Sequence, residues 1–207
     1  MQPERVRRDE AMPVIRDFAR LIKDACQTLE VGGSVRRMAQ FVKDVELVVI
    51  AGDSLRARLD TLVATGRADK ALYGEARSPR WSDKYRGVEF GGLRFEIFFT
   101  DEHSWGYQYW LRTGPGDANE FVMVRMAAGN APYRFRDGAL WIDAQRRVSI
   151  PTEFELFRLL GMPYIYPVGR CVGAYRQYMR RNRWADVASL TLVDGPQDSK
   201  PRQNSLF

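Results

Sequence analysis

The chain contains few of the residues on which many enzyme classes depend. Its 207 residues include one histidine, His103, and two cysteines, Cys26 and Cys171. A single histidine excludes His-rich metal sites and leaves one candidate for Ser/His/Asp or Cys/His catalysis. The two cysteines lack metal-ligand spacing, which argues against a zinc site or a disulfide framework. Carboxylates must therefore supply any acid, base or metal chemistry.

The sequence also lacks a long apolar segment. Its longest apolar run, residues 47–51, is far shorter than the ~20 residues of a membrane span. Residues 1–8 contain no apolar core of a secretion signal. Hydrophobic residues make up 45% and charged residues 28% of the chain, as in an ordinary folded protein. We therefore expect a cytoplasmic protein with no membrane partner.

Basic residues outnumber acidic ones. The chain has 32 lysines and arginines against 26 aspartates and glutamates, a net charge of +6, and most of the basic residues are arginine. Because the guanidinium fork matches phosphate geometry, this balance favours phosphate-bearing partners. A GC-rich genome would produce the same arginine excess, so composition alone does not identify the partner.

The spacing of apolar residues predicts an α+β protein. A 3.6-residue period predicts a helical segment over 4–29, interrupted at Pro13. The expected elements after it are a strand over 44–51, a helix over 54–65, a hairpin of strands 85–90 and 93–100, and helices over 103–111 and 117–128. Beyond residue 130 we expect a strand pair around 137–138 and helices over 152–160, capped by Thr152, and 172–184. The pattern indicates a mixed sheet flanked by helices over 1–130, a small α/β terminal subdomain over 131–190 and a flexible tail over 191–207.

Three carboxylates form the first candidate site. Asp44 and Glu46 lie two residues apart in a predicted strand, so their side chains leave the same face. Glu96 shares that face if its strand is adjacent. Three carboxylates around two metal ions are the arrangement that phosphoryl transfer uses. Acids on a solvent-facing strand are the alternative.

A glycine-serine turn precedes these carboxylates. Gly33 and Ser34 offer backbone N–H groups and a hydroxyl that can cradle phosphate oxygens, and Arg37 can add positive charge. A phosphate cradle followed by two acids and then a third acid is the order of parts expected of a nucleotidyl-transfer site.

In this order of motifs the sequence resembles the family X DNA polymerases of the polymerase-beta-like nucleotidyltransferase superfamily. The family pattern Gly-Ser-x-Arg-Arg, then two acids one residue apart, then a third acid, matches residues 33–37, 44–46 and 96. Thr113, Gly114 and Asn119 are similar to the family's nucleotide-pocket stretch, and residues 155–167 are similar to its closing segment. The resemblance covers roughly residues 5–170 in the right order.

The resemblance implies a nucleotidyltransferase palm and a metal-dependent DNA polymerase that adds dNMP from dNTP to a primer 3′-hydroxyl, filling short gaps in repair or replication. Two Mg²⁺ ions, or Mn²⁺, would bind Asp44, Glu46 and Glu96. The residues implied to hold the nucleotide are Gly33, Ser34, Arg37, Thr113, Gly114 and Asn119. The resemblance begins near residue 5, so we expect no lyase domain, as in small viral members of the family.

Two departures leave other functions open. Family members usually have aspartate at all three metal positions, whereas Glu46 and Glu96 are each one methylene longer. Small aminoglycoside-type nucleotidyltransferases also use an Asp-x-Glu pair, so the acceptor could instead be a small molecule, RNA or protein. A noncatalytic DNA or clamp adaptor is the third interpretation. Arg94 matches a family position that helps to orient the third acid.

The C-terminal region suggests contacts with DNA and with a clamp. Its candidate DNA-backbone contacts lie in a segment without acids and are Arg176, Arg180, Arg181 and Arg183. A solvated helix end is the alternative. Gln203, Leu206 and Phe207 resemble the pentapeptide that binds the bacterial sliding clamp. That resemblance implies a bacterial or phage-infected cell, with the protein near the nucleoid, and gapped or primed DNA as its partner.

Overall fold

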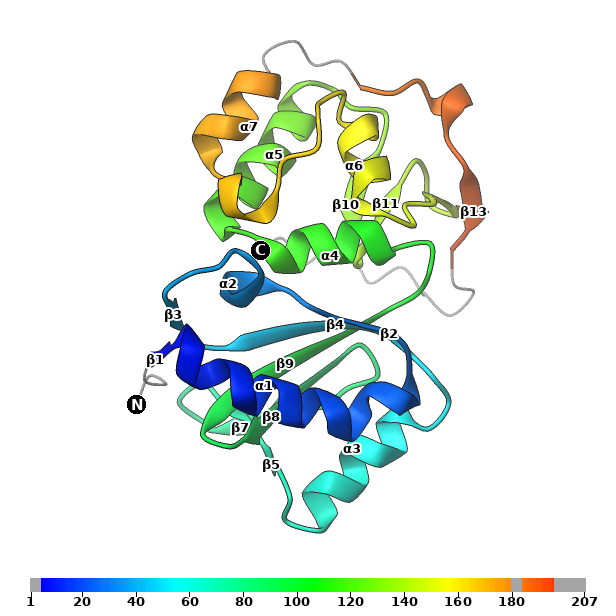
Figure 1. The fold of residues 1–207 in the computed structure, drawn as a ribbon. Helices are drawn as coiled ribbons and strands as arrows, with labels where there is room; N and C mark the ends of the chain where they lie inside the picture. Colours follow the sequence, from blue (N-terminus) through cyan, green and yellow to red (C-terminus); the bar gives the residue numbers. More distant parts are fainter. Residues whose placement is uncertain (1–4, 180–183, 196–207) are drawn as a thin grey trace.

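The computed structural model describes residues 5–179 and 184–195 and shows an α+β protein built from two stacked units (Figure 1). The first unit contains β1 (Val6–Arg7), α1 (Arg8–Ile22), η1 (Lys23–Ala25), β2 (Cys26–Val31), α2 (Gly33–Arg36), β3 (Phe41–Val42), β4 (Val45–Ala51), α3 (Leu55–Ala64), β5 (Asp69–Lys70), β6 (Leu72–Tyr73), β7 (Ser78–Pro79), β8 (Tyr85–Phe90) and β9 (Leu93–Thr100). The second contains α4 (Trp105–Thr113), α5 (Gly116–Ala128), β10 (Arg134–Arg136), β11 (Ala139–Trp141), β12 (Arg146–Val148), α6 (Glu153–Leu159), η2 (Pro167–Gly169), α7 (Val172–Tyr178), η4 (Val187–Ser189) and β13 (Leu192–Asp194).

A five-stranded mixed sheet in the order β2-β4-β9-β8-β5 forms the centre of the first unit. β4 and β9 run parallel, and the remaining pairs are antiparallel. β8 and β9 form the predicted hairpin, whose turn is made by Gly91 and Gly92. Both glycines have positive φ, a conformation that glycine adopts without steric cost. The expected mixed sheet flanked by helices is thus confirmed.

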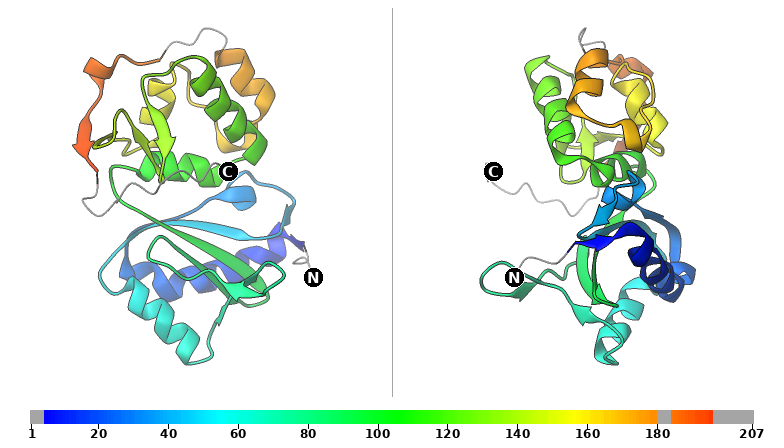
Figure 2. Two further views of the ribbon diagram at one scale, coloured as in Figure 1. Left: turned by 180° about the vertical axis from the view of Figure 1, so that it is seen from behind. Right: turned by 60° about the vertical axis from the view of Figure 1, so that its left-hand side comes forward.

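Helices α1 and α3 cover one face of this sheet. In Figure 2, where the left view is from behind, the sheet lies in front of these helices. The shared core includes Ile15, Phe18 and Ile22 from α1, Leu55, Leu59 and Leu62 from α3, Val45, Leu47 and Val49 from β4, and Phe95 and Ile97 from β9. Because strand side chains alternate, the even-numbered residues of β4 and β9 leave the sheet on its other face.

The N-terminal helix is shorter than the sequence predicts. We expected helix over 4–29, but α1 ends at Ile22 and residues 26–31 form β2 at the edge of the sheet. Pairing with β4 gives these residues a full backbone ladder, which outweighs their local helical spacing. Pro13 lies inside α1 instead of interrupting it, on the exposed side where its ring is accommodated.

The second unit has its own core and a four-stranded antiparallel sheet, β10-β11-β12-β13. Trp110, Tyr133, Phe157 and Tyr175 are almost completely buried in it. The indole of Trp110 donates a hydrogen bond of 2.8 Å to the Tyr175 hydroxyl. Thr152 caps α6 by accepting the N–H of residue 155, as predicted.

Packing divides the chain earlier than we expected. We placed the boundary after residue 130, whereas α4 and α5 bury their apolar sides in the second core with Tyr107, Trp110 and Val122. The tail was expected to begin at residue 191, but Leu192–Asp194 form β13 and pair with β12. A short strand at a sheet edge carries little sequence signal, because its ladder depends on a distant partner.

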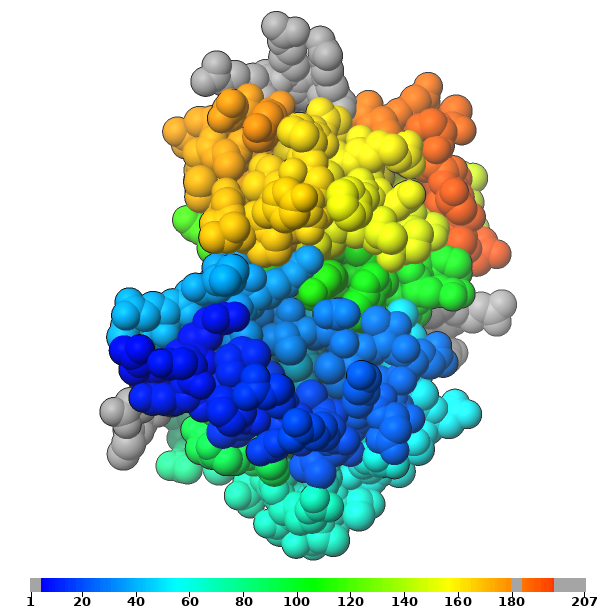
Figure 3. All heavy atoms as spheres, viewed as in Figure 1, coloured from blue at the N-terminus to red at the C-terminus, as the bar shows by residue number. Residues whose placement is uncertain are grey.

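The two units meet at the loop around α2 and at α4. Figure 3 shows these segments, in light blue and green, packed between the lower and upper units. Within the second unit, Gly106 in α4 lies so close to the carbonyl of Thr152, just before α6, that a Cβ would stand 2.1 Å from it, so glycine is required where these two segments meet. Across residues 5–179 and 184–195, every helix is too short or too polar to traverse a lipid bilayer.

Candidate active site

The three predicted carboxylates gather on the sheet face opposite α1 and α3. Glu46 of β4 and Glu96 of β9 are direct register partners in the parallel pair. Neighbouring strands lie about 4.8 Å apart, so both side chains leave the same face side by side. Asp44 stands immediately before β4, two residues from Glu46. The expectation that Glu96 shares the face of the Asp44–Glu46 pair is therefore met by the strand register.

The glycine pair before α2 packs directly on Glu46. The N–H of Gly32 donates a 2.8 Å hydrogen bond to the carbonyl of Glu46. Gly33 has φ +58°, and a Cβ there would lie 1.6 Å from Glu46 Oε2. The positive φ favours glycine at this position, and a larger residue would displace the Glu46 carboxylate. The predicted glycine-serine turn is thus in contact with the carboxylates.

Burial and mutual repulsion disfavour the ionised form of Glu46 and Glu96. Burial raises the pKa of Glu46 to about 8, with further increases from the nearby charges of Asp44 and Glu96. Burial and Asp44 also raise the pKa of Glu96. Glu46 Oε2 is buried and has no hydrogen-bond partner among the described residues. An added cation at this site would relieve both the repulsion and the unpaired oxygen.

Three arginines partly offset this charge. Arg37 lowers the pKa of Glu46, while Arg94 and Arg112 lower that of Glu96. The Arg112 side chain is buried, which lowers its own pKa, and its Cζ lies 3.8 Å from the centre of the Phe98 ring. The sequence pattern predicted no role for Arg112. Its place beside Glu96 follows from the packing of α4 over the sheet, which the local pattern does not encode.

Two tyrosines on the third carboxylate were not predicted. The hydroxyls of Tyr73 in β6 and Tyr85 in β8 are 2.6 Å apart. Burial and Asp44 raise the pKa of Glu96, and Tyr85 opposes part of this increase. A Cβ on Gly87 would lie 2.3 Å from the Tyr73 hydroxyl, so the glycine makes room for it. Gly87 is also the antiparallel register partner of Glu96.

The arginine after Ser34 has a structural partner across the unit junction. Arg36 donates hydrogen bonds of 2.8 and 2.6 Å to the two carboxylate oxygens of Glu153, which lies in α6. Arg170 donates a third, of 2.8 Å, to the same carboxylate. Glu153 is only 5% exposed, and these arginines hold its pKa below the usual range despite its burial. This charged cluster ties the α2 loop to the second unit.

The remaining predicted nucleotide-binding residues surround the same loop. Ser34 Oγ is buried and has no hydrogen-bond partner among the described residues. Arg37 Nη1 donates to the carbonyl of Thr113, and a Cβ on Gly114 would lie 3.0 Å from that nitrogen. Arg37 thereby links the glycine-serine turn to the end of α4. Ser34, Arg37, Thr113 and Gly114 are brought together, although their contact with a nucleotide stays a prediction.

Thr113 and Asn119 already use their side chains within the protein. Thr113 Oγ1 donates a 2.6 Å hydrogen bond to the carbonyl of Tyr109 and accepts one from Arg36. Asn119 is 4% exposed, and its amide donates to the carbonyl of Leu111 at 2.8 Å. In this structure both residues shape the bend between α4 and α5.

The chemistry of the carboxylates fits a divalent cation, but in this structure the side chains do not lie close enough together to form a set of metal ligands. Within residues 5–179 and 184–195, no group of three or more His, Cys, Asp or Glu side chains stands close enough to hold a metal ion. The unpaired Glu46 oxygen and the raised pKa values nevertheless mark a place where positive charge is missing. Oxygen ligands of this kind suit Mg²⁺ and Mn²⁺.

The predicted DNA contacts are only partly described. Arg176 is exposed on α7, with its Cζ 5.7 Å from the centre of the Phe121 ring in α5. The other three candidate DNA contacts and the three candidate clamp contacts, Arg180, Arg181, Arg183, Gln203, Leu206 and Phe207, lie outside the described residues.

Comparison of the sequence with protein-family models finds no matching family, and comparison with curated proteins finds no relative. The resemblance to family X polymerases therefore rests on the motifs and their arrangement alone.

Proposed function

We propose that this protein is a metal-dependent nucleotidyltransferase that adds dNMP from a dNTP to the 3′-hydroxyl of a DNA primer. The observation that carries the proposal is the pairing of Glu46 with Glu96 on parallel strands, directly against Gly33. Nucleotidyl transfer requires carboxylates and a phosphate cradle within one site, and the contact of Glu46 with both Gly33 and the strand of Glu96 supports the proposal.

The residues would divide the work by their chemistry. Asp44, Glu46 and Glu96 would hold two Mg²⁺ ions, which activate the attacking hydroxyl and neutralise the leaving pyrophosphate when bound. Ser34, whose hydroxyl is buried and unpaired among the described residues, would donate to a phosphate oxygen.

Positive charge would come from the two arginines beside the carboxylates. Arg37 stands at the turn and Arg112 stands next to Glu96, so both are placed to offset phosphate charge. Glu96, whose pKa is raised by burial and by Asp44, would accept the proton of the primer hydroxyl. The protein's contribution is therefore positioning and charge compensation, not a covalent intermediate.

The test is incorporation of a labelled dNMP into gapped, primed and single-stranded DNA with Mg²⁺ or Mn²⁺. We expect Glu46→Gln to lower the rate by about three orders of magnitude, because metal-bound carboxylates stabilise the transition state by several kcal/mol. The matched control is Glu120→Gln, which makes the same change at an exposed position of α5. Unchanged incorporation by Glu46→Gln would reject the assignment of the site.

The same assay separates the alternatives. Transfer of a nucleotide to RNA, protein or a small molecule, with no extension of DNA, would support the proposed site but show that its acceptor is not a DNA primer. Binding of DNA without any transfer would support a noncatalytic adaptor instead.

A further inference from the structure

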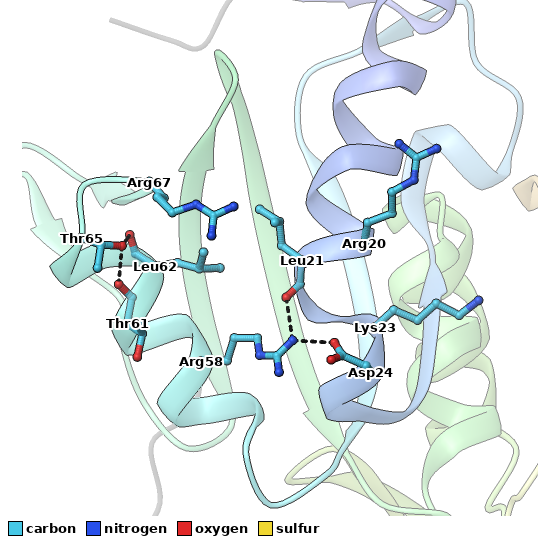
Figure 4. A pocket seen from close by; sticks show the side chains of 9 residues that line it. All are labelled: Arg20, Leu21, Lys23, Asp24, Arg58, Thr61, Leu62, Thr65 and Arg67. Carbon is cyan, nitrogen blue, oxygen red and sulfur yellow. Dashed lines mark hydrogen bonds and ion pairs between the residues drawn. The ribbon is translucent and has the colours of Figure 1, made fainter.

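A hollow of about 800 Å³ lies between α1 and α3, away from the carboxylates (Figure 4). Leu21, near the end of α1, and Leu62, in α3, form the floor of this hollow. Both helices pack on the sheet face opposite Glu46 and Glu96. The hollow is therefore separate from the candidate active site, and an occupant would leave that site open.

One end of this α1–α3 groove is closed by an ion pair. Arg58 of α3 donates hydrogen bonds to the carbonyl of Leu21 at 3.2 Å and to Asp24 at 2.5 Å. Asp24 is the single acidic residue that lines the groove. Because Arg58 holds this carboxylate, it does not neutralise the other basic residues of the lining.

The remaining charge on the groove is positive. Arg20 is paired with Asp17 at 2.8 Å on the outside of α1. Lys23 and Arg67 stand on opposite sides and form no hydrogen bond or ion pair through their side chains with any described residue. In Figure 4 the Arg67 side chain reaches toward the groove, whereas the Lys23 side chain extends away from α3, so Arg67 faces an anionic partner directly and Lys23 adds positive charge at the outer rim.

The floor of the groove is apolar. It consists of Leu21 and Leu62, together with the aliphatic stems of the arginines. The hydroxyls of Thr61 and Thr65, which also line it, donate to the carbonyls of Ala57 and Thr61 at 2.9 and 2.8 Å. These hydroxyls are therefore satisfied within α3 and do not demand a polar ligand.

We propose that this groove binds an acidic peptide segment of a partner protein. An apolar side chain of the peptide would lie between Leu21 and Leu62, while its carboxylates pair with Arg67 and, where the peptide passes over the end of α1, with Lys23. The positive charge of the lining favours an acidic partner, and the apolar floor favours a peptide over nucleic acid. Phosphates need no such floor, and among the described lining residues there is no aromatic ring on which a base could stack.

The experiment selects peptides from a random library displayed on phage, against the full-length protein. The counter-target is the double variant Lys23→Glu/Arg67→Glu, with Arg77→Glu/Lys84→Glu as a control that reverses two exposed cations elsewhere. We expect enriched peptides to carry Asp or Glu beside Leu, Ile, Met or Phe. Their affinity should fall about tenfold or more for the groove variant and stay unchanged for the control.

Three results would overturn the proposal. One is enrichment of no peptide, or of peptides without acidic residues. Another is equal affinity for the wild type and the groove variant, once thermal unfolding has shown that the variant is folded. The third is displacement of the peptide by single-stranded DNA whose own binding depends on Lys23 and Arg67, which would make the groove a nucleic-acid surface. None of these outcomes depends on whether the protein transfers nucleotides.

Discussion

The carboxylate of Glu46 is buried beside two others, so its ionisation costs the folded protein free energy. A glutamate in the unfolded chain titrates near 4.5, whereas Glu46 in the fold titrates near a pKa of about 8. Between these pH values the folded state keeps a proton that the unfolded state has released. Stability without divalent metal should therefore fall as pH rises through this window.

Urea unfolding of the metal-free protein between pH 5 and pH 8 measures this effect, which corresponds to about 1.4 kcal/mol for each unit of pKa difference. We expect the free energy of unfolding of Glu46→Gln, whose side chain cannot ionise, to decline less with rising pH. That of Glu120→Gln should decline as in the wild type. A wild-type protein whose stability rises over the same window would contradict the burial of an unpaired carboxylate.

Tyr85 is predicted to position and ionise the third carboxylate. Tyr85→Phe removes the hydrogen bond that lowers the pKa of Glu96, so the acidic limb of the pH–rate profile for nucleotide incorporation should move to higher pH. A hydrogen bond to a charged group contributes about 1.5–3 kcal/mol, which corresponds to roughly one or two pH units. Tyr107→Phe, in a separate core, is the control. A reduced rate with an unmoved profile would show a merely structural role.

At the scale of single residues, the sequence predicted the three carboxylates but not Tyr85 and Arg112, which lie beside Glu96. Asp44 and Glu46 share a face through the two-residue repeat, which local spacing reveals. The pairing of Glu96 required the register of β4 with β9, and it was stated only as a condition. Tyr85 and Arg112 reach Glu96 from β8 and α4, and contacts between distant segments have no local signature.

Among the elements, the α2 loop depends on glycine for two separate reasons. Gly33→Ala forces alanine into positive φ, at a cost of about 1–2 kcal/mol, and also places a methyl group on Glu46 Oε2. Gly66 has φ +66°, and a Cβ added there would have no atom within 4 Å, so Gly66→Ala measures the φ cost alone. We expect similar losses of stability from backbone strain, but loss of nucleotide incorporation only in Gly33→Ala. Equal nucleotide incorporation by the two variants would show that the α2 loop does not contribute to the candidate active site.

The charged cluster between α2 and α6 should contribute much of the stability of the junction. Glu153→Gln leaves Arg36 and Arg170 without their carboxylate and should destabilise the protein by about 3–5 kcal/mol at neutral pH. The pKa of Glu153 is lowered, so this contribution is present above the usual glutamate pKa and is lost as pH falls.

Glu155→Gln is the matched control in the same helix. Its carboxylate is half-exposed and reaches Arg158 only at 3.5 Å, so urea unfolding should show a change within about 1 kcal/mol. A loss for Glu153→Gln no larger than that of Glu155→Gln would show that the cluster does not hold the units together.

The sequence predicted a secondary-structure element correctly where the residue pattern within that segment specifies it. The β8–β9 hairpin was placed correctly because two alternating runs flank a glycine pair that permits the tight turn. β2 and β13 were missed because each is an edge strand whose ladder comes from a partner far away in sequence. The helices were found from their apolar spacing, and the ends of α3, α4, α5 and α6 lie within two residues of the expected ones. The expected helix over 172–184 is shorter, because α7 ends at Tyr178, and α1 begins at Arg8 instead of residue 4.

At the scale of the whole molecule, the site lies between a sheet and a separately packed second unit. The carboxylates lie on the strands of the first unit, whereas the arginines at the turn are tied to α4 and α6 of the second unit. The motif order predicted that these parts belong together, but it did not predict that α4 and α5 pack with the C-terminal residues. That division depends on the apolar contacts of both helices, which only the folded chain shows.

Titration of the protein with Mn²⁺, followed by electron paramagnetic resonance in the presence of a non-hydrolysable dNTP analogue, tests the central claim most directly. We expect binding by the wild type and by Glu120→Gln, and a loss of binding of about tenfold or more in Glu46→Gln and Glu96→Gln. Equal Mn²⁺ binding by all four proteins would contradict a metal site at the paired strands β4 and β9.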